Sequence, residues 1–291
     1  MKKFKVFLSI ALVLSCLLAF SACSDSKKES DAKSKKVTIA VPTDTTTEAR
    51  ALLLLEEEGY IKLKKDAGIT ATIKDIEENQ YNIEFKEVEA AQLPNILPDV
   101  DYAIINSNYA ISADIDPMKD SLAIEGSASA YGNIVAVKKG NEKADKTKAL
   151  VAALQSKKVK EFIEKEYNGS VVSVVDEPGD GFDKDVDYKK LKGKTITVAA
   201  SPTPHAQILK IAKDILKEKD IKLDIKEYTD YIVPNNVVED GEIDANYFQH
   251  VPYLDDFNKE NKTSIVSVSA IHVEPMGIYS NKHEDLKAIE K

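Results

Sequence analysis

The sequence predicts an α/β protein with mostly parallel sheets. Short runs rich in β-branched residues alternate along the chain with amphipathic stretches of helical composition, which is the pattern of strand–helix–strand units. The length of 291 residues predicts about two domains. Apolar residues make up 43% of the chain and charged residues 31%, the balance of a globular protein that can build one or two ordinary cores.

The first 22 residues are predicted to be a signal peptide. A basic start with three lysines is followed by an apolar run at 6–20, which is shorter than a membrane-spanning helix. Ser21 and Ala22 then precede Cys23, and this ending resembles a bacterial lipoprotein processing site. The resemblance implies cleavage before Cys23 and lipidation of its sulfur, and two acyl chains are enough for stable anchoring.

Residues 23–36 are polar and charged, so they predict a flexible tether between the lipid and the folded part. We therefore expect the protein on the extracytoplasmic face of the cell membrane. An ordinary secretory peptide with an incidental cysteine and processing at Cys16 are the alternatives. Because both cysteines precede residue 24, a disulfide framework and a cysteine-ligated zinc site are excluded.

The folded part is predicted to begin near Val37, and its first series of elements runs to residue 175. Residues 37–41 form a β-branched strand, and residues 48–61 have helical composition. A short helical stretch is expected at 90–97, and two amphipathic helices are expected within 144–167. The further strands expected in this series are 82–89, 100–108, 133–140 and 170–175.

A second series opens with a strand at 195–201. Thr203 followed by Pro204 predicts a helix N-cap with proline at the first helical position. The helix that follows has one apolar face, formed by Ile208, Ile211, Ala212, Ile215 and Leu216. The segments that complete the alternation are 222–229, 242–249, 252–260, 264–269 and 272–280.

Residues 176–190 join the two series and show no apolar periodicity. The stretch contains one proline, two glycines and five aspartates, which predicts a solvated connector. A calcium-binding loop is the alternative interpretation. The connector lacks both the EF-hand spacing of acidic residues and the closing glutamate, so we favour the solvated connector.

The chain has 39 lysines, one arginine and 49 acidic residues, for a net charge of −9. This balance argues against a nucleic-acid partner, because such proteins bind largely by neutralising phosphates. The one arginine, Arg50, is a candidate for a task that lysine performs poorly, the bidentate capture of a carboxylate. It follows the strand at 37–41, and open α/β sheets bind ligands at the carboxyl ends of their strands. An exposed arginine on a helix face is the alternative.

Two further groups of residues have the chemistry of an amino-acid site. Asn106, Asn108 and Asn133 lie near predicted strands, and their amides supply both donors and acceptors. A second group could form an apolar cage with a polar rim, and it contains Tyr228, Tyr231, Tyr247, Phe248, His250 and Tyr253. For any one of these aromatic residues taken alone, a place in the core is the simpler explanation.

The stretches RALLLL, EAAQLP, INSNYA, TDY, EIDANYFQHVPYL and HVEPMGIYS resemble the NlpA-type lipoproteins, which are methionine-binding proteins of ABC importers. The resemblance covers most of residues 37–291 apart from 176–190. It implies a two-lobed periplasmic-binding-protein (type II) fold with a hinge. The two halves stand in exchanged order relative to that family, so we expect a circular permutation. Lys291 and Val37 should then lie close together, because new chain ends are tolerated where the original ends were neighbours.

This resemblance also implies a division into lobes. One lobe is expected to comprise 37–130, with 281–291 returning to it, and the other to comprise 131–280, including the connector. The hinge is expected where the chain crosses between the lobes, near Gly132 and Ile278. The ligand would lie in the cleft between the lobes, and closure of the hinge would bury it.

The resemblance further implies roles for individual residues. Arg50 should pair with the carboxylate of L-methionine or a related amino acid, and Asn108 and Asn133 should bond its amino and carboxyl groups. The side chain would be surrounded by Tyr231, Phe248, His250 and Tyr253, since a thioether makes favourable contacts with aromatic faces. The expected partners are the permease and ATPase subunits of a methionine-type ABC importer. We expect a monomer without a cofactor.

Other functions are less well supported. An enzyme is not expected, because the folded part contains no cysteine, no G-x-S-x-G motif and no H-E-x-x-H spacing. A metal-binding importer lipoprotein could use His250, His272 and Glu274 as ligands, although Arg50 in the cleft would repel a cation. A surface adhesin or antigen is a third possibility for a lipoprotein, without a sequence feature that favours it.

Overall fold

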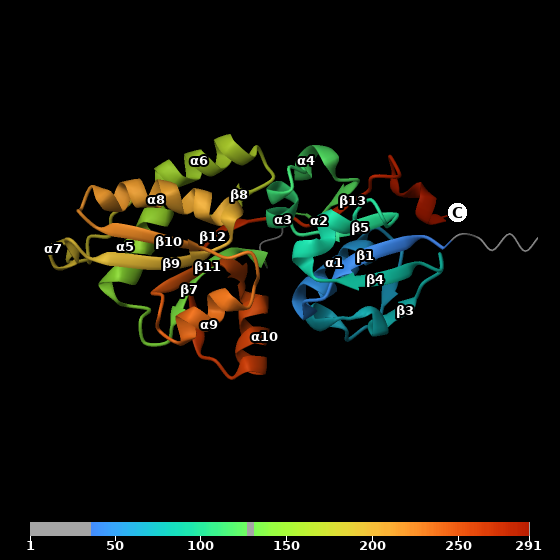
Figure 1. The fold of residues 1–291 in the computed structure, drawn as a ribbon, viewed down its shortest axis with the longest axis horizontal. Coiled ribbons are helices and arrows are strands. Elements are labelled where there is room, and N and C mark those ends of the chain that lie inside the picture. The colour runs from blue at the N-terminus through green and yellow to red at the C-terminus, as the bar shows by residue number, and fades with distance from the viewer. Residues whose placement is uncertain (1–35, 127–130, 291) are drawn as a thin grey trace, which may run out of the picture. The chain divides into compact units, whose positions relative to one another are not determined.

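The computed structural model describes residues 36–126 and 131–290. The predicted signal peptide, Cys23 and the predicted tether up to residue 35 lie outside the described residues. Residues 36–291 form one compact unit. None of the helices in the described part is long and apolar enough to cross a lipid bilayer. The described chain builds two large β-sheets, each with helices against it (Figure 1).

The first sheet has five strands, four of which come from residues 38–124. In spatial order they are β4 (Glu84–Val88), β1 (Thr38–Pro42), β5 (Tyr102–Ile105), β13 (Gly277–Tyr279) and β6 (Ala123–Ile124). Strand β1 runs parallel to β4 and β5, whereas β13 runs antiparallel to β5 and β6. A separate two-stranded sheet pairs β2 (Lys62–Leu63) with β3 (Ile76–Glu78).

Helices cover both faces of the five-stranded sheet. On one face, Ile39 and Val41 of β1 pack with Leu52 and Leu55 of α1 (Thr45–Glu57). On the other face, Ala40 packs in a cluster with residues around α2 (Leu93–Ile96) and α3 (Ser107–Ser112). This alternation follows from the two-residue period of a strand. The remaining short helix of this region is α4 (Pro117–Asp120).

The second sheet has six strands and is built mainly from residues after 131. In spatial order they are β10 (Lys222–Glu227), β9 (Thr195–Ala200), β11 (Ala245–His250), β7 (Asn133–Lys138), β12 (Ile265–Val273) and β8 (Val172–Ser173). Strand β9 runs parallel to β10 and β11. Strand β7 runs antiparallel to both of its neighbours, and so does β12.

The six-stranded sheet is also covered on both faces. Val135 and Val137 of β7 face a large core formed with α5 (Asp145–Leu154), α6 (Lys157–Tyr167) and α8 (Gln207–Lys217). Ile134 and Ala136 of the same strand face a smaller core with α9 (Val233–Glu239) and α10 (Val251–Asn261). Each lobe of this two-lobed α/β fold therefore has its own sheet and its own core.

The prediction of mostly parallel sheets is wrong, because both sheets are mixed. The chain passes between the sheets twice, once between β6 and β7 and once between β12 and β13. The strands that follow these crossings, β7 and β13, are antiparallel to the strands they join. The second crossing occupies residues 274–276, slightly before the position expected near Ile278, which already pairs with Ile104.

Several element boundaries differ from the expected ones. Helix α1 begins at Thr45 rather than at 48 and ends at Glu57. The strand expected at 100–108 ends at Ile105, and Asn106 is the N-cap of α3, which places Asn108 in the first turn of that helix. The strand expected at 170–175 is reduced to Val172–Ser173.

The predicted N-cap at Thr203 is wrong. Helix α8 begins at Gln207, after an irregular helical turn at Pro202–Ala206 in which Thr203 has an extended backbone. Two prolines in this turn supply no backbone N–H, so a regular helix starts only after them. The expected apolar face of the helix is confirmed, since Ile208, Ala212, Ile215 and Leu216 are buried and Ile211 is partly buried.

Most residues of the connector at 176–190 are exposed, as expected of a solvated connector, but parts of it pack against the six-stranded lobe. Val186 is buried in the large core of the six-stranded sheet, and Phe182 packs against the same core. The ammonium of Lys219 lies 4.5 Å from the centre of the Phe182 ring. Gly179 forms two backbone hydrogen bonds with the chain at the start of α6. Ordered packing explains why the stretch retains Phe and Val among its aspartates.

The first and last described parts of the chain share one core. Val37 packs against the cluster that contains Ile39, and Leu286 and Ile289 are buried members of that cluster. The hydroxyl of Tyr102 in β5 donates to the carbonyl of Asp285, at 2.8 Å. In Figure 1 the red C-terminal segment lies beside the start of β1. Lys291, for which we predicted proximity to Val37, lies outside the described residues.

Candidate ligand-binding site

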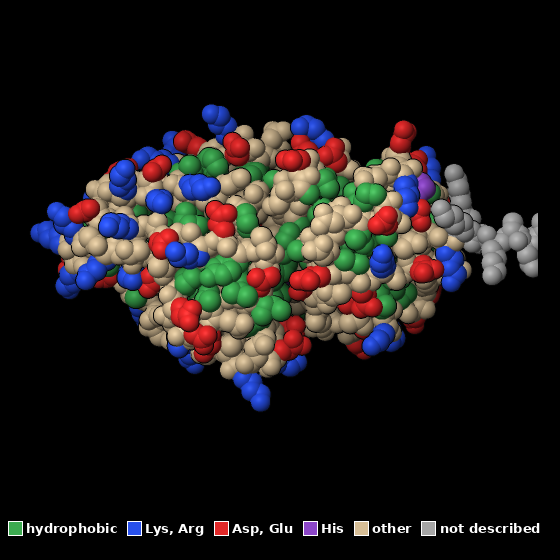
Figure 2. Space-filling model, viewed as in Figure 1, with side chains coloured by type: hydrophobic (Ala, Val, Ile, Leu, Met, Phe, Trp, Pro, Cys, Tyr) green, Lys and Arg blue, Asp and Glu red, His purple; other side chains and the backbone are tan. Residues whose placement is uncertain are grey.

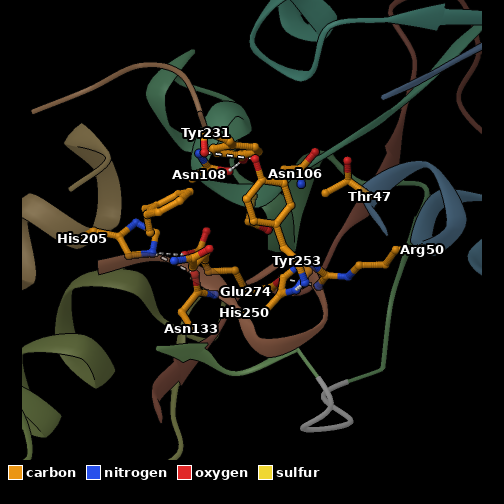
Figure 3. A pocket seen from close by; sticks show the side chains of 13 residues that line it. Thr47, Arg50, Asn106, Asn108, Asn133, His205, Tyr231, His250, Tyr253 and Glu274 are labelled. Atoms are coloured by element: carbon orange, nitrogen blue, oxygen red, sulfur yellow. Dashed lines mark hydrogen bonds and ion pairs between the residues drawn. The ribbon is translucent and has the colours of Figure 1, made fainter. Parts of the chain in front are cut away.

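A cavity lies among side chains contributed by both lobes (Figure 3). All seven residues that we predicted to bind a ligand line it, and they are Arg50, Asn108, Asn133, Tyr231, Phe248, His250 and Tyr253. Two of the other lining residues were named in the sequence analysis, Asn106 among the candidate amides and Glu274 as a candidate metal ligand. The lining residues that it did not assign to a site are Thr47, Ser107, His205 and Gln249. Binding of a ligand by these residues stays a prediction.

The cavity is small in this structure. It leaves about 30 Å³ for the centres of water-sized molecules, which is room for about two waters. Hydrogen bonds between the lobes help to close it: the hydroxyl of Tyr231 donates to Asn108 Oδ1 at 2.8 Å, and that of Tyr109 donates to the carbonyl of Thr229 at 3.0 Å. A molecule of the size of an amino acid can therefore enter only if the lining moves apart.

Arg50 is buried and already has partners. Its Nε lies 2.9 Å from both carboxylate oxygens of Glu125, and its Nη2 also donates to that carboxylate. The same Nη2 donates to the backbone carbonyl of Glu274 at 2.7 Å. The guanidinium lies 4.5 Å from the centre of the Tyr131 ring. Glu125 in turn accepts a hydrogen bond from the backbone N–H of Met276, so Arg50 and Glu125 contact both crossing segments.

The aromatic side of the cavity comes from β11, from the start of α10 and from the loop before α9. The ring of Phe248 lies 5.9 Å from that of Tyr231 and 6.1 Å from that of Tyr253, centre to centre. His250 is the N-cap of α10, where its Nδ1 accepts from the backbone N–H of Tyr253. Burial, helped by the charge of Arg50, lowers the pKa of His250 to about 3.

The opposite side holds a buried polar cluster of His205, His272 and Glu274. One carboxylate oxygen of Glu274 lies 2.7 Å from Nε2 of His272 and 3.2 Å from Nε2 of His205. His205 Nε2 also lies 2.9 Å from Asn133 Oδ1, and the Tyr247 hydroxyl bonds Nδ1 of His272. Burial lowers the pKa of both imidazoles to about 3 and raises the pKa of Glu274. Neutral imidazoles that donate from Nε2 to the Glu274 carboxyl oxygen satisfy these contacts, and the backbone N–H of Asn108 also bonds this carboxyl group.

The alternative hypothesis of a metal site, with His250, His272 and Glu274 as ligands, is wrong about His250. In the described part of the chain, the donors close enough together to hold an ion belong to His205, His272 and Glu274. His250 is instead used to cap α10. Strand β7 separates β11 from β12 in the sheet, which keeps His250 apart from His272. The hydrogen bonds within the cluster account for the positions of its three side chains.

The residues missed by sequence reasoning fall into two groups. Thr47 precedes Arg50 by three residues on α1, so helical spacing could have indicated that both share a face. Glu125 and the backbone carbonyl of Glu274, a residue named before only as a candidate metal ligand, reach Arg50 because the chain crosses twice between the lobes near them. No local pattern in the sequence marks such contacts.

The comparison with known families decides the membership of the chain. The family model described as NlpA lipoprotein matches residues 14–175 and 196–291, which is well over half of the chain. The chain belongs to the NlpA lipoprotein family. The part that the NlpA model leaves unmatched, 176–195, contains the whole predicted connector.

Curated relatives of this NlpA family member match over about half of the chain. Membrane lipoprotein TpN32 of Treponema pallidum is 42% identical over 46% of this chain and 50% of its own length. The D-methionine-binding lipoprotein MetQ of Escherichia coli is 40% identical over 46% of this chain and 50% of its own length. The chain thus spans about half the length of the curated relatives it matches.

Among solved structures, a nutrient binding protein from Burkholderia cenocepacia bound to methionine is similar to this chain. Its sequence is 47% identical, with a TM-score of 0.46 over 47% of this chain and 58% of that one.

Proposed function

We propose that this NlpA family member is the substrate-binding lipoprotein of an ABC importer and captures methionine or a related amino acid. The observation that carries the proposal is the cavity itself, in which both lobes place a guanidinium, a carboxylate, several amides and an aromatic wall (Figure 3). Opposite charges with amides suit an amino-acid zwitterion, and the aromatic wall suits a thioether. The names of relatives such as MetQ point to the same ligand. The protein binds its substrate and does not transform it.

The proposed roles follow the sequence expectations. Arg50 faces the carboxylate end of the ligand, and Asn108 and Asn133 bond its polar groups. Tyr231, Phe248, His250 and Tyr253 surround the side chain. Movement at the two crossings opens the cavity, and closure re-forms the bond from Tyr231 to Asn108.

The proposal includes attachment to the cell membrane through a lipid on Cys23, with residues 23–36 as the tether. The partners are the permease and ATPase subunits of the importer, and the binding protein acts as a monomer. On the face shown in Figure 2, basic and acidic side chains both spread over the surface, and this pattern fits a protein partner better than a polyanion.

Circular permutation of the family fold is part of the proposal. Val37 and Ile289 share one core, as expected if the usual chain continued from the last residues into the first. The connector lies between the two segments that the family model matches. Relatives align over about half of the chain, which is expected when a linear alignment meets exchanged halves.

Thermal unfolding of the full-length protein in detergent, against a panel of amino acids and divalent metals, tests the function. A ligand at about one hundred times its dissociation constant adds roughly 2.7 kcal/mol to the free energy of unfolding, so methionine should raise the melting temperature visibly. Alanine and lysine serve as controls with the same zwitterion and a different side chain. A rise with zinc or manganese but not with any amino acid would contradict the proposal.

A further inference from the structure

Three buried amide side chains, which we call the amide cluster, bond one another beside the cavity. Asn235 and Asn246 are fully buried, and Gln249 is 3% exposed. Asn235 Oδ1 accepts from Nδ2 of Asn246 at 2.8 Å and from Nε2 of Gln249 at 2.7 Å. Asn235 Nδ2 donates to Gln249 Oε1 at 3.0 Å, and Gln249 Nε2 donates to Asn246 Oδ1 at 3.0 Å. Asn246 Nδ2 also donates to the carbonyl of Pro234 at 3.1 Å.

The amide cluster depends on a β-bulge in β11. Two steps along β11, from Tyr247 to Gln249, match one step along β7, so Phe248 is the extra residue. In a regular strand, residues three apart point to opposite faces of the sheet. The bulge instead lets Gln249 reach Asn246, three residues before it, on the face where α9 packs and supplies Asn235 (Figure 1).

The amide cluster joins the two segments that carry aromatic residues of the cavity. Gln249 directly follows Phe248, and Asn235 lies in the first turn of α9, four residues after Tyr231. Asn235 and Asn246 themselves are not among the residues that line the cavity. An effect of these two amides on a ligand must therefore pass through the residues that they hold in place.

Hydrogen-bonded amides fix a geometry that apolar side chains would leave open. The core beside the amide cluster is apolar and includes Val238, Ile134 and Ala136. Apolar groups tolerate several packing arrangements, whereas an amide donor requires its acceptor in one direction. Both N–H donors of Asn246 and of Gln249 have acceptors. A buried network with satisfied donors stabilises one arrangement of the chain segments that it connects.

We propose that the amide cluster is a positioning device for the ligand-binding wall. It holds the bulge of β11 against the start of α9, so that Phe248 and Tyr231 face the cavity before a ligand arrives. All three amides belong to one lobe, so the cluster stays intact when the lobes move apart. A wall that is already ordered spares the ligand the free energy of ordering it. The inference rests on the proposed function and adds positioning residues to it.

Calorimetric titration with L-methionine compares the full-length protein in detergent with Asn235→Ala and Val238→Ala. Val238 is the matched control, because it is fully buried on the same helix and lies in the apolar core rather than in the amide cluster. Asn235→Ala should weaken methionine binding at least about tenfold, and Val238→Ala should stay within about threefold of the unaltered protein. Equal affinities of the two variants would overturn the inference, because Asn235 would then contribute to stability alone.

A double-mutant cycle with Gln249→Ala tests whether the amides act as a unit. Either substitution alone already opens the amide cluster, so the variant with Asn235→Ala and Gln249→Ala together should bind methionine about as weakly as the weaker single variant. If the two losses of affinity multiplied instead, Gln249 would act only as a lining residue, and the inference would be wrong.

Hydrogen exchange of the side-chain amides in the unaltered protein decides the matter if a variant fails to fold. Without methionine, the N–H protons of Asn246 and Gln249 should exchange at least about one hundredfold more slowly than those of the exposed Asn141. Protection that arises only with methionine would overturn the inference and leave the proposed function standing, because the ligand would then assemble the cluster. Absence of methionine binding by the unaltered protein would overturn both.

Discussion

Three histidines near the cavity are buried as neutral groups. His205 and His272 share the carboxylate of Glu274, and His250 caps α10. Burial holds the pKa of each near 3, below the ordinary value of 6.5. Folding therefore keeps protons off these three imidazoles at pH values where the unfolded chain would bind them, and this difference makes stability depend on pH.

The free energy of unfolding should fall as the pH drops from about 6.5 toward 3. Below pH 6.5 the histidines of the unfolded chain bind protons, whereas the buried imidazoles of the folded protein do not. For each histidine, the free energy of unfolding therefore falls by up to about 1.4 kcal/mol per pH unit. The raised pKa of Glu274 acts in the opposite sense in the acidic range and makes the fall shallower. Urea unfolding at pH 7 and pH 5 measures the effect, which His205→Gln should reduce. Equal midpoints at the two pH values would count against it.

Single residues of the site could be predicted from the sequence where their residue type is rare in the chain or concentrated in one segment. Arg50 is the one arginine of the chain, and the segment from Tyr247 to Tyr253 is rich in aromatic residues. Glu125 is 75 residues away from Arg50 in sequence, and its role depends on the first crossing between the lobes. Such a contact is set by tertiary structure and leaves no periodic trace in the sequence.

At the scale of elements, the connector is held to the six-stranded sheet by a close approach between backbone and helix. Gly181 has a φ of +100°, and a Cβ placed on it would lie 2.7 Å from Cγ2 of Ile215 on α8. Ile215 is fully buried in the large core, so it has little room to move. Glycine is required here both by backbone conformation and by space.

Gly181→Ala should lower the free energy of unfolding by about 1–3 kcal/mol, from backbone strain and overpacking together. Gly179→Ala is the matched control, because its added Cβ would meet nothing closer than a backbone nitrogen at 3.9 Å. Denaturant unfolding of both variants measures the difference. If Gly181→Ala proved as stable as Gly179→Ala, the connector would not be packed as described.

Helices and central strands could be predicted from the sequence, because apolar periodicity reports which face is buried. The two helices of 144–167 and the apolar face of α8 are examples. The direction of β7 and β13 could not be predicted, because it depends on the chain returning from the other lobe. The sequence predicts too early a start for α8, because Thr203 and Pro204 match an N-cap pattern. Pro202 precedes them, and the regular helix begins only after the irregular turn at Pro202–Ala206.

At the scale of the whole molecule, a circular permutation involves two places in the chain, its two ends and the connector. Val37 and Ile289 belong to one core, whereas Lys184 and Asp185 are exposed within the connector. If the fold is permuted, joining the present ends and opening the connector should restore the family order. Exposed backbone tolerates such a cut.

A variant that begins at Asp185, runs through residue 291 into a short glycine–serine linker and Val37, and ends at Lys184 should fold cooperatively. Its far-ultraviolet circular dichroism should match that of the parent, and it should bind methionine within a few fold. A control linker of the same composition inserted after Glu89 tests tolerance to insertion alone. Aggregation of the reconnected variant beside a folded control would contradict the permutation.

The position of β13 has a consequence for biosynthesis. This strand lies between β5 and β6 in the five-stranded sheet, yet it is formed by residues 277–279, near the end of the chain. A chain made from its amino terminus exposes the edge of β5 until nearly all of its residues have emerged. The lobe that contains the first strand is therefore the lobe that finishes last, and the edges of β5 and β6 are open to proteases and to wrong strand pairing until β13 is in place.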